Sequence, residues 1–364
     1  MQTNMIACEL CSSGYPDQGA PYRCPGCGGL FDWTHPFPWQ PAASEKNTSG
    51  IWCWRSTFGL PELTDPVSLG EGDTPLVEDR YQGQTIFYKM ESLNPTGSYK
   101  DRASSVLATF LRSRQVSSAV EDSSGNAGAS FAAYAARAGI QARIFVPATA
   151  SGPKRRQIET YGAQLVPVAG PRSAASEAVE REAAAGAVYA SHACMPFGMA
   201  GIATLAYEMF DQLGGIPGTV IVPAGHASLA LGILRGFKAL QNTGCCERLP
   251  VMLVVQSAAC APIFATWNHM PPPEVEEPTL AEGVKVLHPV RMAALVREMD
   301  RERDQVLAFS DDQVRSARAE LARRGIDVEP TSALTWCGLV NAGRKLPEPI
   351  TLVLSGSGLK YDGK

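Results

Sequence analysis

The chain of 364 residues has a formal net charge of −4, with 45% hydrophobic and 19% charged residues, as in an ordinary soluble globular protein. This length allows two or more domains, and the slightly acidic balance argues against nucleic acid or an anionic membrane as a partner, because such binding needs an excess of Lys and Arg on one face. No segment approaches the roughly 20 apolar residues of a membrane span, and the N-terminus lacks the features of a secretory signal, so we expect a cytoplasmic protein with reduced cysteines.

Residues 1–40 differ from the rest of the chain, because they are rich in Gly, Pro and aromatic residues and show little periodicity. They contain two Cys-x2-Cys pairs separated by twelve residues. Two such pairs can form two turns that each offer two thiolates to a tetrahedral Zn²⁺. We therefore expect a zinc-ribbon-like segment, in which a structural zinc closed to substrate is bound by Cys8, Cys11, Cys24 and Cys27. The alternative is that these four cysteines are free or linked by disulfide bonds.

From about residue 105, short apolar runs alternate with longer helical patterns. The apolar runs predict strands over 117–122, 142–147, 163–168, 187–191, 218–224, 250–257 and 350–358. The helical patterns predict helices over 126–139, 153–162, 172–186 and 228–240. Such alternation implies right-handed crossovers and a mostly parallel sheet, and the continuously apolar strands fit burial on both faces. These patterns therefore predict an α/β fold.

Two of the strand-to-helix junctions have the composition of anion-binding turns. In the first, a Ser-Ser-Gly-Asn turn precedes an Ala-rich helix, so the amides at the helix N-terminus and the side chain of Asn126 suit an anionic group. The second follows the strand over 218–224 and consists of Gly225, His226, Ala227, Ser228 and Leu229. Its small side chains let backbone N–H groups surround a phosphate. Each junction taken alone is equally a capped helix, and the chain has no G-x-G-x-x-G or Walker loop for a nucleotide.

Lys100 lies behind a Pro-Thr-Gly turn, between Tyr99 and Asp101. A lysine amine becomes nucleophilic in a suitable environment, and its usual covalent partner is a carbonyl group. An aldehyde cofactor with a phosphate needs such a lysine, a phosphate-binding turn and a group beside its ring nitrogen. The last predicted strand offers the third part in Ser355, whose hydroxyl can face a neutral ring nitrogen. Together these parts predict a covalently bound aldehyde cofactor.

Six segments, in this order, resemble the motifs of fold-type II pyridoxal 5′-phosphate (PLP) enzymes, and most closely those of threonine synthase and its relatives. They are SLGEGDTPL at 68–76, NPTGSYKDR at 94–102, SSGNAGAS at 123–130, VPAGH at 222–226, EPTSA at 329–333 and LSGSGLK at 354–360. The resemblance covers roughly residues 50–360. Several of these relatives also begin with a zinc-ribbon-like segment.

The resemblance implies two three-layer α/β domains with mostly parallel sheets, in addition to the zinc-ribbon-like segment of residues 1–40. A large PLP-binding domain would comprise residues 41–104 and 206–364. A smaller, mobile domain of residues 105–205 would carry the Asn126 loop and close over the substrate. The expected partner is a small amino-acid substrate, and a homodimer is left open because such relatives are often dimers.

The resemblance also implies roles for individual residues. Lys100 would bind PLP as an imine and, once displaced by the incoming amino acid, would take its α proton. Asn126 would donate a hydrogen bond to the hydroxyl oxygen of the ring. The turn of residues 225–229 would bind the phosphate, largely through backbone amides, and Ser355 would face the pyridine nitrogen. The substrate carboxylate would be bound by Ser123, Ser124 and Gly125.

A serine beside the pyridine nitrogen leaves carbanion charge less delocalised than a carboxylate would, which favours prompt loss of a β or γ substituent over transamination. We therefore expect a threonine synthase-like PLP lyase or synthase of amino-acid metabolism, which performs elimination or replacement through an external aldimine. Two alternatives within the fold are a cysteine synthase-like β-replacement enzyme and a serine or threonine dehydratase. The non-enzyme alternative is a zinc-ribbon binding module attached to a degenerate PLP fold.

The sequence departs from threonine synthases where those enzymes hold the phosphate of O-phosphohomoserine. Ala127 stands where a Thr is expected after the loop asparagine. A segment expected to resemble NPxRLEGQKT reads MPFGMAGIAT at 195–204, so that Gly198, Ala200 and Ile202 replace its Arg, Glu and Lys. The site has therefore lost charge where a second phosphate would bind.

Two interpretations of this loss follow. In the first, Lys154, Arg155 or another residue compensates, and the enzyme makes threonine from O-phosphohomoserine. In the second, which we favour, the protein is a divergent relative that acts on a less anionic or bulkier amino acid.

Overall fold

The computed structural model describes residues 5–42, 49–61, 64–148, 152–170, 172–275 and 277–362. These residues form two compact units. The first unit comprises the described residues of Met1–Gly72, Asn94–Gly201 and Asp362–Lys364, and the second comprises those of Asp73–Leu93 and Ile202–Tyr361. The boundary at residue 201 lies inside one continuous helix, α5 (Phe197–Leu213). The domain bounds predicted from the sequence, at residues 40, 104 and 205, stay a prediction.

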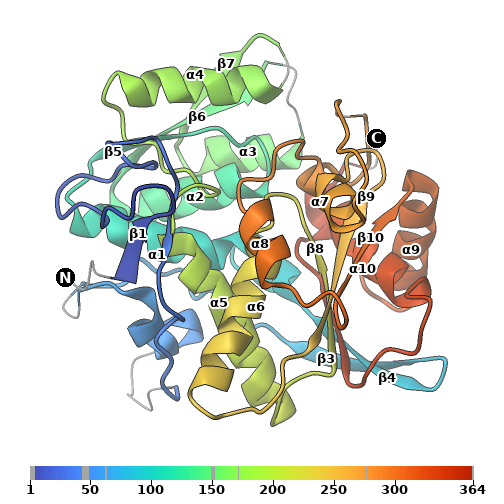
Figure 1. The fold of residues 1–364 in the computed structure, drawn as a ribbon. Helices are drawn as coiled ribbons and strands as arrows, with labels where there is room; N and C mark the ends of the chain where they lie inside the picture. The colour runs from blue at the N-terminus through green and yellow to red at the C-terminus, as the bar shows by residue number, and fades with distance from the viewer. Residues whose placement is uncertain are drawn as a thin grey trace. The chain divides into compact units, whose positions relative to one another are not determined.

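A three-stranded parallel sheet is the centre of the first unit, in the order β5 (Ser118–Glu121), β6 (Gln141–Pro147) and β7 (Gln164–Val168). One face is covered by α2 (Asn126–Ala138) and α3 (Pro153–Thr160), and the other by α4 (Arg172–Ala184), as Figure 1 shows. Side chains alternate along β6 accordingly. Ile144 lies under Gly128 of α2, whereas Phe145 packs with Ala175 and Val179 of α4.

Three further elements belong to the first unit. The helix α1 (Lys100–Ser113) packs against α2. The short strands β1 (Ile6–Cys8) and β2 (Phe31–Trp33) pair antiparallel inside the zinc-ribbon-like segment. Glycine ends α2 as expected from the sequence, because Gly139 adopts a left-handed φ of 73° just after the last helical residue.

A six-stranded sheet is the centre of the second unit, in the order β10-β9-β8-β11-β4-β3. All neighbouring strands are parallel except the hairpin of β3 and β4. The strands are β3 (Leu76–Tyr81), β4 (Gln84–Lys89), β8 (Thr219–Pro223), β9 (Val251–Ser257), β10 (Gln305–Phe309) and β11 (Ile350–Val353). The carboxyl ends of the parallel strands meet at one edge, where the loops that follow β8 and β11 begin.

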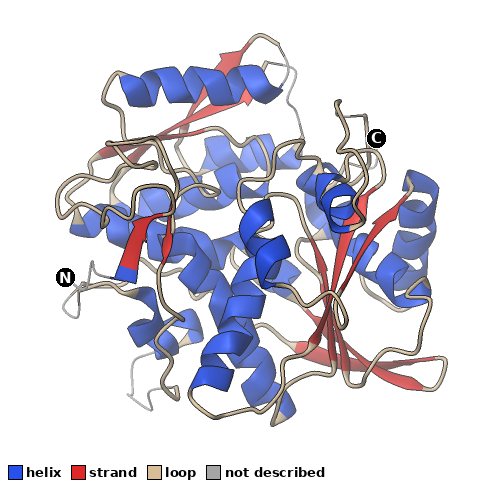
Figure 2. Cartoon of the chain, in the orientation of Figure 1, coloured by secondary structure: helices blue, strands red, loops and turns tan. Residues whose placement is uncertain are grey.

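Helices flank this sheet (Figure 2). One face packs against α9 (Asp311–Arg323) and α10 (Pro330–Val340), and α6 (Ser228–Asn242) lies on the opposite face (Figure 1). The core under α10 contains Ile221, Leu253 and Leu352 from three neighbouring strands. Two short helices complete the unit, α7 (Pro262–Trp267) beside β10 and α8 (Met292–Glu298) beside α6.

The structure confirms the predicted α/β fold with mostly parallel sheets and contains all the helices predicted from the sequence. The predicted strand over 187–191 was wrong, since only Tyr189 forms a bridge, to Val120, before the chain turns at residues 192–194. The β3–β4 hairpin was missed because β3 is an exposed edge strand without a continuous apolar run. Among the described residues, no helix is both long and apolar enough to cross a membrane.

Candidate functional site

Lys100 is the first residue of α1, and its Nζ lies 4.9 Å from the centre of the Tyr99 ring. The next residue, Asp101, is fully buried. Its carboxylate accepts hydrogen bonds from the backbone N–H and the hydroxyl of Thr96, at 2.6 and 2.5 Å, and from Ser130 Oγ at 2.6 Å. Asp101 therefore ties the turn before Lys100 to α2 and fixes the place where α1 begins.

Glu71 supports α1 from a second direction. This buried carboxylate accepts hydrogen bonds from Ser105 Oγ of α1 at 2.6 Å, Tyr134 OH of α2 at 2.7 Å and Trp52 Nε1 at 2.8 Å. It also accepts one from the backbone N–H of Leu69 at 2.9 Å. Burial, together with the charges of Asp101 and Glu71, raises the pKa of Tyr134, so its hydroxyl stays a donor. Glu71 thus has a structural role that joins α1 to α2.

The loop of residues 123–125 connects β5 to α2 in the first unit. The backbone N–H of Ser123 donates to Glu121 Oε2 at 2.6 Å, and that of Gly125 donates to Ser123 Oγ at 3.1 Å. A Cβ atom on Gly128 would lie 1.8 Å from the carbonyl oxygen of Ser123, so only glycine allows the loop to lie this close to α2. Asn126 follows as the first residue of this helix. The loop predicted to bind a carboxylate is therefore held against a helix N-terminus.

Beside this loop lies a buried cluster of Glu121, Asp122 and His192. Glu121 Oε1 is 2.7 Å from His192 Nδ1, and Asp122 accepts hydrogen bonds from Tyr189 OH at 2.8 Å and from Ser176 Oγ. Burial raises the pKa of Glu121 to about 8. Burial opposes ionisation of Asp122 as well, but the charges around it, that of Arg172 first, leave its pKa below the usual value.

Sequence reasoning missed this cluster. Glu121 and His192 are 71 positions apart, and no local pattern marks either residue as functional. The only available signal was the position of Glu121 directly before the Ser-Ser-Gly-Asn turn.

The residues that replace the charged family positions are packing residues. Gly198 lies against α1, where its Cβ would be 3.1 Å from the Cβ of Ala103. Gly201 is even closer, since its Cβ would lie 2.1 Å from the carbonyl oxygen of Arg102. Ala200, between them, is fully buried. The first turn of α5 therefore contributes small side chains to close contact with α1.

In the second unit, the predicted phosphate-binding turn connects β8 to α6. Ala227 adopts a left-handed φ of 71°, and the Cβ of a residue replacing Gly225 would lie 2.8 Å from the carbonyl oxygen of Gly283. Ser228 is the first residue of α6, and its buried Oγ has no hydrogen-bond partner within the part of the chain that the structure describes. A buried hydroxyl at a helix N-terminus fits an oxygen-rich anion such as phosphate.

Ser355 follows β11 in the second unit and is almost fully buried. Its Oγ is 3.1 Å from Ser332 Oγ, which also accepts a hydrogen bond from the backbone N–H of Gly356 at 2.9 Å. A Cβ on Gly356 would lie 2.3 Å from Glu329 Oε1, so the turn after Ser355 is closely packed. A neutral hydroxyl in this fixed position fits a neutral pyridine nitrogen, as expected from the sequence.

The predicted residues are divided between the units. The first unit holds Lys100, the loop of residues 123–125, Asn126 and the four cysteines, and the second holds residues 225–229 and Ser355. Each set fits its part of PLP, because the first has the amine and the second has the buried Ser228 hydroxyl for phosphate and a fixed serine for the ring.

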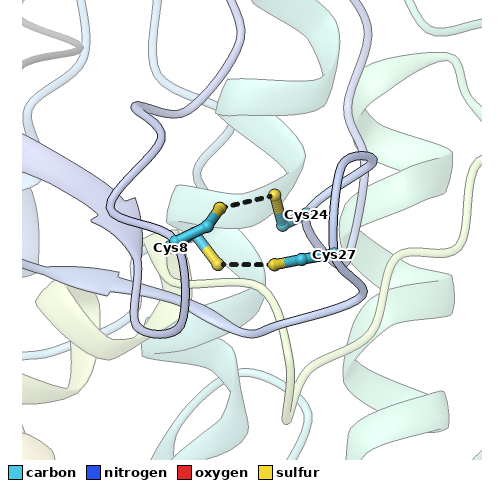
Figure 3. Close-up of side chains that lie close together, drawn as sticks. Cys8, Cys24 and Cys27 are labelled. Carbon is cyan, nitrogen blue, oxygen red and sulfur yellow. Dashed lines mark hydrogen bonds between the residues drawn. The ribbon is translucent and has the colours of Figure 1, made fainter.

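The four cysteines of the zinc-ribbon-like segment lie together, with all their sulfur atoms within 4.8 Å of one another. The Sγ–Sγ distances are 3.4 Å for Cys8 and Cys27 and 3.6 Å for Cys11 and Cys24 (Figure 3). These exceed the ~2.05 Å of a disulfide bond. They are close to the ~3.8 Å that a tetrahedral site with ~2.3 Å Zn–S bonds requires.

The segment is packed against the rest of the first unit. The ring of Tyr15 contacts those of Phe31 and Phe197 edge-on, at centroid distances of 4.6 and 5.0 Å. Trp33 Nε1 donates a hydrogen bond to the carbonyl oxygen of Pro196 at 3.1 Å. The segment thus contacts the start of α5 directly.

Comparison with known proteins gives a consistent result. Residues 67–356 match the family of pyridoxal-phosphate dependent enzymes. The chain is 31% identical over 378 residues to the threonine synthase of Methanocaldococcus jannaschii, covering 97% of this chain and 92% of that protein. It is 32% identical over 322 residues to the threonine synthase of Mycobacterium leprae, covering 85% of this chain and 88% of that protein.

Solved structures share the fold. Maize serine racemase superposes with a TM-score of 0.69 at 21% identity, covering 78% of this chain and 88% of that one, which shows likeness of fold alone. A bacterial-type threonine deaminase, from the source abbreviated T.th., has a TM-score of 0.65 at 26% identity, covering 78% of this chain and 92% of that one.

Proposed function

Because this chain belongs to the pyridoxal-phosphate-dependent enzymes and is a threonine synthase-like member of fold type II, we propose that it eliminates or replaces a substituent of an amino acid that carries no phosphate. Family membership makes it an enzyme, so the alternative of a degenerate binding module has no support left. The substrate, the cofactor-binding residues and the catalytic residue are the parts that we propose.

Bound PLP supplies an electron-accepting ring that stabilises negative charge at the α carbon of an attached amino acid. Lys100 holds the cofactor through Nζ and, when released, accepts the α proton there as a general base. Ser228 Oγ and the N-terminal amides of the 15-residue helix α6 bind the phosphate together with residues 225–227. Ser355 faces the pyridine nitrogen, where its neutral hydroxyl leaves the nitrogen unprotonated and so favours early loss of a β or γ substituent.

The substrate carboxylate is bound by Ser123, Ser124 and Gly125 at the N-terminus of α2. Since the backbone N–H of Ser123 already donates to Glu121, Ser123 contributes its hydroxyl rather than its amide. Asn126 donates to the hydroxyl oxygen of the ring. Carboxylate binding at this place orients the amino acid relative to Lys100.

One observation carries the choice of a phosphate-free substrate. A second dianion needs cationic or multiple hydroxyl donors. At the positions where the family pattern places them, Gly198 lies against Ala103 and Ala200 is fully buried. Small residues in close contact with α1 provide neither the charge nor the space for a phosphate clamp.

The direct test offers purified, PLP-loaded protein O-phosphohomoserine, O-acetylhomoserine, O-acetylserine, serine and threonine in parallel. We expect turnover of a substrate with an acetyl or hydroxyl substituent, and phosphate release from O-phosphohomoserine at under about one hundredth of that rate, because a missing charge-assisted contact costs on the order of 3 kcal/mol. The protein with Lys100→Ala is the control and should be inactive with every substrate. Efficient formation of threonine and phosphate would refute the substrate assignment while leaving the chemistry intact.

A second candidate is threonine synthase itself, because the 31% identity to the Methanocaldococcus jannaschii enzyme extends over 97% of this chain. In that case Lys154 or Arg155 of α3 would bind the substrate phosphate. Replacing both with alanine should then raise the KM for O-phosphohomoserine at least tenfold. Unchanged kinetics in this double variant would remove the compensating clamp from consideration.

We also propose a structural Zn²⁺ bound by Cys8, Cys11, Cys24 and Cys27, a homodimer and a cytoplasmic location. The sulfur positions support the metal. Metal analysis of the purified protein tests the zinc, and light scattering tests the dimer, for which a single-chain mass of 38.8 kDa would be the contrary result.

A further inference from the structure

Glu121 is the last residue of β5 and precedes by two residues the loop that we assign to the substrate carboxylate. Its carboxyl group makes two separate contacts. Oε2 accepts the backbone N–H of Ser123 at 2.6 Å, and Oε1 lies 2.7 Å from Nδ1 of His192. The Glu121 side chain is fully buried and that of His192 is 12% exposed. A single buried carboxyl group therefore connects the loop to an imidazole.

The backbone around this pair is fixed. The N–H of Val120 donates to the carbonyl of Val188 at 2.8 Å, and the N–H of Ala190 donates to the carbonyl of Val120 at 2.9 Å. These bonds hold the segment that leads to His192 alongside the end of β5. Neither partner can leave the other without breaking them, so the contact is built into the first unit.

Charged groups from three directions act on the pair. They are Asp122 next in the chain, Arg172 on α4 and Lys100 on α1. Burial first, and then the charge of Asp122, raises the pKa of Glu121 to about 8, which Arg172 and Lys100 partly oppose. Burial and the charge of Lys100 lower the pKa of His192 well below its usual value, against the opposing charge of Asp122.

The pair is therefore uncharged near neutral pH. Glu121 keeps its proton and donates it in the hydrogen bond to Nδ1 of His192, which places the imidazole hydrogen on Nε2. When the pair loses one proton, the proton on Nε2 leaves to solvent and that of Glu121 moves to Nδ1. The products are a carboxylate and a neutral imidazole, so one net negative charge appears beside the loop.

We propose that Glu121 is a positioning residue whose protonated carboxyl group, held by His192, keeps the loop of residues 123–125 receptive to the carboxylate of an amino-acid substrate. This inference rests on the proposed function and adds a proton-linked control of substrate affinity to it. Ionised Glu121 repels the substrate carboxylate across a buried, weakly screened distance. Affinity is therefore full below the pKa of the pair and is lost as the pH rises through it.

The kinetic test uses the PLP-loaded enzyme and its best amino-acid substrate between about pH 6 and about pH 10. For the wild type, KM should rise about tenfold per pH unit above about pH 8, as expected when one deprotonation abolishes binding, while kcat changes far less. Glu121→Gln keeps a donor toward His192 and an acceptor for Ser123, so its KM should lose this rise. Glu177→Gln, at an exposed position on α4, is the matched control and should follow the wild type.

A second measurement does not depend on turnover. Nitrogen-15 NMR of the cofactor-free protein should show Nε2 of His192 changing from a protonated to an unprotonated nitrogen as the pH passes about 8. His192→Gln identifies the signal among the five histidines, and Glu121→Gln should hold the ring in its low-pH form. An invariant ring over this range, or an equal rise of KM in the wild type and Glu121→Gln, overturns the inference.

The two proposals fail in different ways. If no amino acid alters the cofactor spectrum, the proposed function fails, and the NMR titration still decides whether the pair exists. If the ring changes as expected but KM stays flat, the pair is a structural feature and its coupling to the loop is refuted.

Discussion

Ser228 is the side chain of the second unit whose surroundings most clearly require a ligand, because its hydroxyl is buried at the first position of α6 without a partner among the described residues. Ser228→Ala should weaken PLP binding by 10- to 100-fold, because a hydrogen bond to a charged group contributes about 1.5–3 kcal/mol. The cofactor-free protein should keep its free energy of unfolding. Spectral titration with PLP measures the affinity, and Ser316→Ala on the exposed side of α9 serves as control. Equal affinities for the two variants would place the phosphate elsewhere.

At the scale of elements, the loop after β5 depends on a glycine in α2. Gly128→Ala places a methyl group 1.8 Å from the carbonyl oxygen of Ser123, so the loop must move away from the helix. We expect unfolding to become easier by about 1–3 kcal/mol and substrate affinity to fall, while PLP still reacts. Urea denaturation and KM measure the two effects. Gly215→Ala, where a Cβ meets no atom within 4 Å, should be neutral, and a neutral Gly128→Ala would show that the loop is not held as described.

The zinc-ribbon-like segment is the second element whose role can be tested. If zinc organises it, chelation or Cys8→Ser should release the metal and loosen the contact of Trp33 with Pro196. Tryptophan fluorescence should then change, and proteases should cleave within residues 5–42 first. Disulfide-linked cysteines in the native protein, found by mass spectrometry, would contradict a metal site.

Local sequence patterns predicted the elements whose burial is continuous and failed where pairing decides. The strands β8 and β9 are buried along their whole length, so their apolar runs were sufficient. The edge strand β3 is mostly exposed and has no such run. The Glu121–His192 contact depends on a bridge between Val120 and Tyr189, and no pattern within a short window contains that pairing.

At the scale of the whole molecule, stability depends on a buried ion pair in the second unit. Lys89 Nζ lies 2.7 Å from Glu208 Oε2, at exposures of 0% and 3%, and also donates to the carbonyl of Thr74 at 2.8 Å. Glu208→Ala leaves the lysine charge buried without its partner, which should lower the free energy of unfolding by about 3–5 kcal/mol. Urea denaturation checks this. Asp312→Ala removes an exposed ion pair and should cost under about 1 kcal/mol, and equal costs would contradict the burial.

The central claim is that one amine of the chain holds the cofactor, and a chemical measurement on the whole protein tests it most directly. The PLP-loaded protein is treated with borohydride, which reduces an imine to a stable amine, and is then digested and mapped by mass spectrometry. We predict a phosphopyridoxyl group on Lys100 alone and none in the protein with Lys100→Ala. An adduct on another lysine, or a cofactor-containing protein without any adduct on Lys100, would contradict the account.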